Sequence, residues 1–370
     1  APVGPARWAA PVAPDPWTGI REARSPGPAA PQNPAMMRLL SALAGTGPAG
    51  IGDDCLTVNV WTPATDARKR PVMVWIHGGA FMMGSGGAEV YNGHELASRG
   101  DVVVVTLNYR LGAIGFLQLA DVAPEGPFAS NPGLRDQVAG LEWVRDNIAA
   151  FGGDPGRVTI FGESAGGMSV GALLGTPAAK GLFHGAIAQS GAAHNISSRE
   201  SAAQVSETFL RELGLGRDEP ERLFDVPDAA LLKAQRKTAI RLGFAHRGLP
   251  FQPAEDGHWL PHQPLEATLA GDGAQVPLLI GTNRDEWDLF QAGDRKAKEM
   301  GEDDLRRRFA RAVPEDEVDD LHALYREALP GRSPRRRWAT FQTDRVFRAP
   351  AERLAAVHSK NNPVYGYCFT

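Results

Sequence analysis

The chain has 370 residues, a net charge of -4 and hydrophobic residues at 43% of its positions. This length suits one large α/β domain, and the small net charge gives no reason to expect a nucleic acid or an anionic membrane surface as a partner. No apolar run reaches the roughly 18 to 20 residues that span a bilayer.

The N-terminal half predicts a surface segment, three strands and a long helix. Residues 1–50 are rich in Pro and Gly and predict an extended segment that lies on the surface. Residues 56–61 alternate in the way of a half-buried strand, and 71–76 and 102–107 are continuous apolar runs, typical of strands covered on both faces. Apolar residues then recur every three or four positions from Leu134 to Phe151, which indicates an amphipathic helix.

The C-terminal half continues the alternation of buried strands and helices. The predicted strands are 158–162, 185–190, 275–281 and 363–369, and the predicted helices are 168–174, 302–328 and 338–358. This alternation predicts one domain over 1–370, with a mostly parallel sheet and helices on both faces. Residues 197–274 interrupt the pattern, and we expect them to form a cap over the site.

A Gly-x-Ser-x-Gly sequence, Gly162 to Gly166, connects one of these strands to the helix that follows. Strand, sharp turn and helix in this order are the context of a nucleophile elbow, in which a strained turn exposes the serine. Glycines two residues before and after Ser164 avoid collisions with the neighbouring strand and helix. The sequence therefore predicts that Ser164 is a nucleophile.

A serine hydroxyl also needs donors for the oxyanion that forms when it attacks a carbonyl. The turn His77-Gly-Gly-Ala-Phe81 follows the strand at 71–76, and its small residues let backbone N–H groups point into a site. The N–H of Ala165, directly after the nucleophile, would be a further donor.

Five ordered motifs carry a family resemblance. They are Asp53 to Pro63, Pro71 to Phe81, Asn108 to Gly112, Asn147 to Pro155 and Phe161 to Gly167. Together they resemble the type-B carboxylesterases, in particular their p-nitrobenzyl esterase-like bacterial branch. The resemblance implies an α/β-hydrolase fold and a serine carboxylic ester hydrolase that acts on small-molecule esters through an acyl-enzyme on Ser164.

The same resemblance implies an oxyanion hole formed by the N–H groups of Gly79, Ala80 and Ala165. We also expect Phe81 and Met83 to contact the substrate.

Chain order places the acid of a catalytic triad between the serine and the histidine, at the end of a strand. Asp285, Glu286 and Asp288 follow the strand at 275–281 and all satisfy this condition. The family pattern Gly-x-x-x-Asp-Glu selects Glu286. The family usually has Gly after this residue, whereas this chain has Trp287, which we expect to fill or reshape part of the pocket.

The resemblance places the catalytic histidine in a loop after the last major strand. None of the nine histidines occupies that position, so we expect them to be structural or surface residues and the catalytic histidine to lie beyond Thr370. On this reading the sequence is a fragment that lacks both ends of the family domain and is nearly inactive as given.

Other functions have less support. A non-catalytic binding or adhesion module of the same fold is the alternative, although such a module would not need Ser164 in a strained elbow. Hydrolysis of lactones or carbamates stays open. Cys55 and Cys368 lack the spacing of a metal site or a disulfide framework, and we expect no cofactor and no metal. We expect a monomer in the cytoplasm, with secretion left open.

Overall fold

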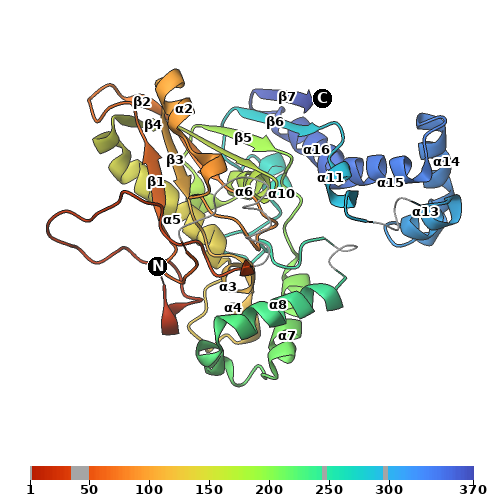
Figure 1. Cartoon of the computed structure of the whole chain (residues 1–370), viewed down its shortest axis with the longest axis horizontal. Helices are drawn as coiled ribbons and strands as arrows, with labels where there is room; N and C mark the ends of the chain where they lie inside the picture. The colour runs from red at the N-terminus through yellow and green to blue at the C-terminus, as the bar shows by residue number, and fades with distance from the viewer. Residues whose placement is uncertain (1, 35–49, 244–247, 295–298) are drawn as a thin grey trace.

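The computed structural model describes residues 2–34, 50–243, 248–294 and 299–370. Its centre is a seven-stranded sheet with the strand order β1-β3-β2-β4-β5-β6-β7 (Figure 1). The strands are β1 (Val58–Trp61), β2 (Arg70–Ile76), β3 (Val103–Leu107), β4 (Gly153–Glu163), β5 (Gly185–Gln189), β6 (Leu278–Asn283) and β7 (Val364–Phe369). Only β1 and β3 pair antiparallel among these strands, so the prediction of a mostly parallel sheet is confirmed.

Helices on the sheet connect its strands. Helix α2 contacts β3, and α5, α6 and α16 pack against the sheet, with α10 between α6 and α16. The bounds in this group are α2 (His94–Gly100), α3 (Gly112–Phe116), α4 (Leu119–Val122), α5 (Pro132–Asn147), α6 (Ala165–Leu174), α10 (Pro264–Ala270), α11 (Trp287–Gln291) and α16 (Ala349–His358). Every residue of β3 is buried, as its continuous apolar run predicts.

A buried ion pair anchors the N-terminal segment to this core. Arg110 and Asp136 form a bidentate pair with both side chains almost fully buried. The same guanidinium donates to the backbone carbonyls of Arg7 and Ala9 at 3.0 and 2.7 Å. Since every buried polar group needs a partner, the extended segment completes the hydrogen bonding of Arg110.

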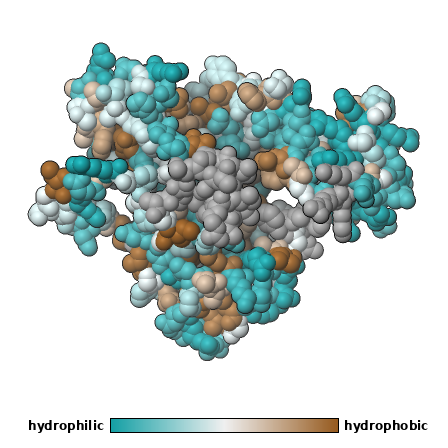
Figure 2. All heavy atoms as spheres, viewed as in Figure 1, coloured by the Kyte–Doolittle hydropathy of each residue, from teal (hydrophilic) through white to brown (hydrophobic). Residues whose placement is uncertain are grey.

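Three C-terminal helices form a separate unit, here termed the helical cluster: α13 (Glu302–Phe309), α14 (Val318–Ala328) and α15 (Pro334–Thr343). The cluster projects from the sheet, and its surface in this view is mostly hydrophilic (Figures 1 and 2). Its small core is separate from the main one and consists of Met300, Leu305, Phe309, Val318, Trp338 and Phe341.

The predicted helix at 302–328 is two helices, because Pro314 lies in the interval 310–317 and cannot continue a helix. The predicted helix at 338–358 begins earlier, at Pro334, and contains a π-helical turn at Asp344–Arg348. A further pair, α7 (Arg199–Leu213) and α8 (Asp228–Arg241), lies within the region 197–274 and packs against α4 and α3.

Candidate active site

The strand register brings the predicted site residues to one edge of the sheet. Ile76 of β2 lies beside Gly162 of β4, and Glu163 of β4 lies beside Gln189 of β5. Gln189 in turn pairs with Gly281 of β6. The turns after these four strands therefore meet at their carboxyl ends, which is where open α/β sheets bind ligands.

Ser164 occupies the strained turn that the sequence predicts. Its backbone angles are φ 56° and ψ -123°, and it lies between β4 and the first residue of α6. A side chain on Gly166 would place its Cβ 2.0 Å from the carbonyl oxygen of Ile76, and one on Gly162 would lie 2.6 Å from the same atom. Both glycines are therefore required for the elbow to pass under β2.

The glycine turn after β2 lies directly against this elbow. A Cβ on Gly78 would lie 3.2 Å from the Cβ of Ser164. Gly79 and Ala80 both have positive φ, at 113° and 55°, a conformation that costs energy for alanine. No described residue accepts a hydrogen bond from the backbone N–H of Gly79, Ala80 or Ala165. Free N–H groups beside a nucleophile are what an oxyanion hole requires.

His77 and Tyr109 stabilise the glycine turn after β2. Their rings stack at 4.5 Å, and the Tyr109 hydroxyl donates to the carbonyl oxygen of His77 at 2.7 Å. Burial lowers the pKa of His77 to about 4, so the ring is neutral near pH 7, and its Nδ1 lies 2.8 Å from the carbonyl oxygen of Gly78. We therefore assign His77 to the support of the turn.

A cavity of about 330 Å³ opens between Ser164 and the residues that follow β6. Both polar and apolar side chains line it. The lining consists of Glu163, Ser164, Asn283, Arg284, Asp285, Glu286, Leu289, Phe290, Phe347, Phe369 and Thr370. Within the described part of the chain, this lining contains no histidine and no residue from 197–274, so the cap over the site stays a prediction.

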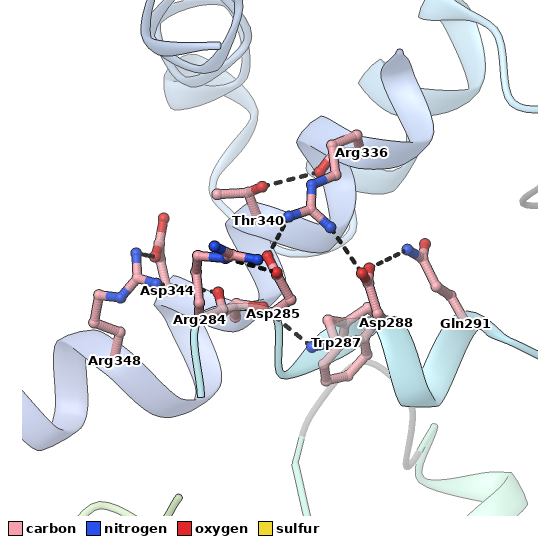
Figure 3. A network of polar contacts seen from close by, with 10 residues as sticks. Arg284, Asp285, Trp287, Asp288, Gln291, Arg336, Thr340, Asp344 and Arg348 are labelled. Carbon is pink, nitrogen blue, oxygen red and sulfur yellow. Dashed lines mark hydrogen bonds and ion pairs between the residues drawn. The ribbon is translucent and has the colours of Figure 1, made fainter. Parts of the chain in front are cut away.

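Of the three candidate acids, Glu286 is the one whose carboxylate is buried and held by hydrogen bonds from the sheet side. It is only 9% exposed and lines the cavity. Its Oε1 accepts from the Ser190 hydroxyl at 2.5 Å and from the backbone N–H of Asn283 at 2.7 Å. Asp285 and Asp288 are instead paired with Arg336 (Figure 3).

The sequence interpretation missed Ser190 and Asn283, which hold Glu286. The side-chain amide of Asn283 also donates to Oε2 of Glu286 at 3.0 Å. Ser190 is buried with a positive φ of 49° directly after β5. A polar residue at the carboxyl end of a buried strand beside the elbow strand was a signal that could have identified it.

Trp287 was expected to reshape the pocket, and Phe81 and Met83 were expected to contact the substrate. Trp287 packs against the core of the helical cluster and is not part of the cavity lining. Phe81 is fully buried and packs edge-on against Phe116, while Met83 is half-buried. Neither Phe81 nor Met83 lines this cavity, and their contact with a substrate stays a prediction.

A sequence model of the carboxylesterase family matches residues 1–370. The chain belongs to the carboxylesterase family. It is 42% identical to the para-nitrobenzyl esterase of Bacillus subtilis (strain 168) over 369 residues, which cover 100% of this chain and 72% of that protein. It is 35% identical to the phenmedipham hydrolase of Pseudarthrobacter oxydans, with the same coverage of each chain.

Solved structures of carboxylesterases have the same fold. A carboxylesterase of Geobacillus stearothermophilus superposes with a TM-score of 0.87 at 40% identity and covers 100% of this chain and 73% of its own. A PNB esterase superposes with a TM-score of 0.84 at 41% identity, over 99% of this chain and 73% of its own. The predicted α/β-hydrolase fold is thereby confirmed, and family membership supports an ester hydrolase that acts on small-molecule esters.

Within this carboxylesterase fold, Glu163 lines the cavity together with the carboxyl groups of Asp285 and Glu286. Part of the residue is open to solvent, but the protein around its carboxyl group and the nearby charge of Glu286 raise the pKa of Glu163 to about 7. A carboxyl group that titrates near neutrality beside Ser164 makes the charge of this cavity dependent on pH.

Other features of the described residues concern partners and metals. No group of three potential metal ligands occurs among them. None of their helices combines the length and apolar character needed to cross a membrane. Cys55 is a buried free thiol and Cys368 an exposed one.

Proposed function

We propose that this chain hydrolyses carboxylic esters through an acyl-enzyme on Ser164. The Ser164 hydroxyl oxygen attacks the ester carbonyl as its proton passes to a base, and the N–H groups of Gly79, Ala80 and Ala165 hold the oxyanion. The intermediate expels the alcohol, which takes that proton, and leaves an acyl-serine. Water then adds to the acyl group and releases the carboxylic acid. The observation that supports this proposal most is the strained Ser164 beside three N–H groups without an acceptor.

Glu286 is the proposed acid that orients the base. The cavity has both Ser164 and Glu286 in its lining, and its volume exceeds that of an imidazole ring. His322 and His358 are engaged elsewhere, with Glu302 and with the carbonyl oxygen of Val276. No described histidine lines the cavity. We therefore expect slow turnover by the 370-residue chain, because no imidazole is in place to accept the proton of Ser164.

Added imidazole tests this assignment. Hydrolysis of p-nitrophenyl butyrate is measured with the 370-residue chain across imidazole concentrations, and the rate with Ser164→Ala is subtracted to remove hydrolysis by imidazole alone. We expect a saturable, Ser164-dependent rate.

Glu286→Gln tests the acid, with Asp285→Asn as its matched control. We expect Glu286→Gln to lower the imidazole-dependent rate by about 10² to 10⁴, since an amide cannot stabilise the imidazolium, and Asp285→Asn to lower it far less. An equal rate in the parent chain and Ser164→Ala would refute the proposed nucleophile. An equal effect of the two acid variants would refute Glu286.

A further inference from the structure

The acid Glu286 lies on a short turn between β6 and α11, and the residues on both sides of it contact a different part of the molecule. Figure 3 shows these residues together with side chains from α15. Arg336 of α15 donates from Nη1 to Asp288 at 2.7 Å, and from Nη2 to Asp285. A single guanidinium therefore bridges the residue before Glu286 and the residue two positions after it.

Two further bonds come from the same direction. The backbone N–H of Trp287 donates to the hydroxyl of Thr343, the last residue of α15, at 3.1 Å. Arg348, at the end of the π-helical turn, donates to the carbonyl oxygen of Arg284 at 3.2 Å. The Trp287 side chain packs against the core of the helical cluster. The turn that carries Glu286 is thus attached to α15 and to the π-helical turn that follows it.

From these contacts we propose that Arg336 is a positioning residue for Glu286. The proposal rests on the proposed function, because it assumes that Glu286 is the catalytic acid. The sheet holds the carboxylate end of Glu286 through Ser190 and Asn283, whereas Arg336 binds the side-chain carboxylates of Asp285 and Asp288, which lie before and after that residue. A carboxylate that orients an imidazole must be held to a fraction of an ångström by such supporting bonds.

The charges and the exposure of Arg336 and its two partners indicate that the ion pairs act on the Glu286 turn and not on the stability of the whole protein. Partial burial opposes ionisation of Asp285, but hydrogen bonds from Arg284 and Arg336 lower its pKa. The side chains of Asp285, Arg336 and Asp288 are 28%, 34% and 47% exposed. Ion pairs at this exposure contribute little to global stability, so removing Arg336 should loosen the turn without unfolding the protein. A planar guanidinium is also suited to bridge two carboxylates, which the point charge of lysine is not.

The test compares Arg336→Gln and Arg336→Lys with Arg306→Gln. Arg306 is a matched control because it makes an ion pair with Asp319 within the helical cluster and has no recorded contact with the Glu286 turn. Hydrogen exchange is followed in peptides that cover 283–291 and, separately, the elbow at 160–168. We expect Arg336→Gln to accelerate exchange in 283–291 by about 3- to 30-fold, Arg336→Lys to have an intermediate effect, and Arg306→Gln to have none.

Imidazole-dependent hydrolysis of p-nitrophenyl butyrate gives the second readout. We expect Arg336→Gln to raise the half-saturating imidazole concentration about fivefold while the KM for the ester changes less than twofold, since only the imidazole contacts Glu286. A general loss of structure would instead change both parameters and the exchange of the elbow peptides. Such a general loss would refute a positioning role.

The two readouts separate this proposal from the proposed function. If the parent chain shows no Ser164-dependent hydrolysis, the proposed function fails, and the exchange of 283–291 alone decides whether Arg336 holds the turn. If the parent hydrolyses the ester and Arg336→Gln behaves like Arg306→Gln in both measurements, the positioning role is refuted and the proposed function stands.

Discussion

The two halves of the candidate site are held in place by different forces. On the nucleophile side, Gly78, Gly162 and Gly166 allow backbone segments to approach so closely that a methyl group would not fit. On the acid side, Glu286 lies on a turn held by partly exposed charged groups of the helical cluster. Steric fit is insensitive to salt and pH, whereas exposed ion pairs are screened by salt. The comparison teaches that the Ser164 side is the rigid half of the candidate site and the Glu286 side the adjustable half.

The largest effect should come from crowding the rigid half. Gly166→Ala would place a Cβ 2.0 Å from the carbonyl oxygen of Ile76, which the buried backbone can relieve only by moving apart. We expect the free energy of unfolding to fall by about 3 kcal/mol or more. Urea denaturation followed by circular dichroism measures this loss.

Gly293→Ala is the matched control for this substitution, because a Cβ at Gly293 meets no heavy atom of the described residues within 4 Å. Its free energy of unfolding should change by less than about 0.5 kcal/mol. Similar losses in the two variants would mean that close approach does not define the nucleophile side.

The next largest effect should be a pH dependence of the free energy of unfolding that comes from Glu163. The folded protein raises the pKa of Glu163 from its ordinary 4.5 to about 7, so over this interval the folded state binds more protons than the unfolded state. The contribution of Glu163 to the free energy of unfolding is therefore fully present below pH 4.5 and is lost as the pH rises to about 7.

We expect the wild-type chain to lose more stability between pH 5 and pH 8 than Glu163→Gln does, as measured by urea denaturation at both values. Glu142→Gln, at an exposed position of α5, serves as the control. If the pH dependence of Glu163→Gln equals that of the wild type, Glu163 does not titrate in the way described.

The smallest expected effect is the response of each half to salt. Raising NaCl from about 0.05 to 1 M shortens the Debye length from roughly 14 Å to 3 Å, which weakens the pairs of Arg336 with Asp285 and Asp288. Hydrogen exchange in 283–291 should accelerate about twofold, while exchange in 160–168 should not change. Equal acceleration in both peptides would remove the distinction between the halves.

The strained turn at Ser164 could be predicted from the sequence because its determinants are local. The glycines around Ser164 and the turn from His77 to Phe81 each lie within five consecutive residues, and their steric requirements can be read without a tertiary structure. The helix predicted at 302–328 was wrong, but the signal for its break is also local, because Pro314 lies at the break.

The adjustable half was harder to predict because its contacts are long-range. Ser190 bonds to a carboxylate 96 positions away, and Arg336 to one 51 positions away. The orientation of Trp287 towards the helical cluster depends on where α15 packs. Residue spacing does not encode such contacts. The family resemblance selected Glu286, which is buried and lines the cavity, and its role as the acid stays a prediction.

The buried guanidinium of Arg110 has a consequence for the order of folding. It joins α5 to the carbonyls of Arg7 and Ala9, which lie 103 and 101 residues earlier in the chain. Closing a loop of this length costs entropy before any contact compensates for it, whereas the Arg110–Asp136 pair joins residues only 26 positions apart. The N-terminal segment should therefore dock late, after the first strands and α5 have formed, and its docking withdraws the last polar groups of Arg110 from water.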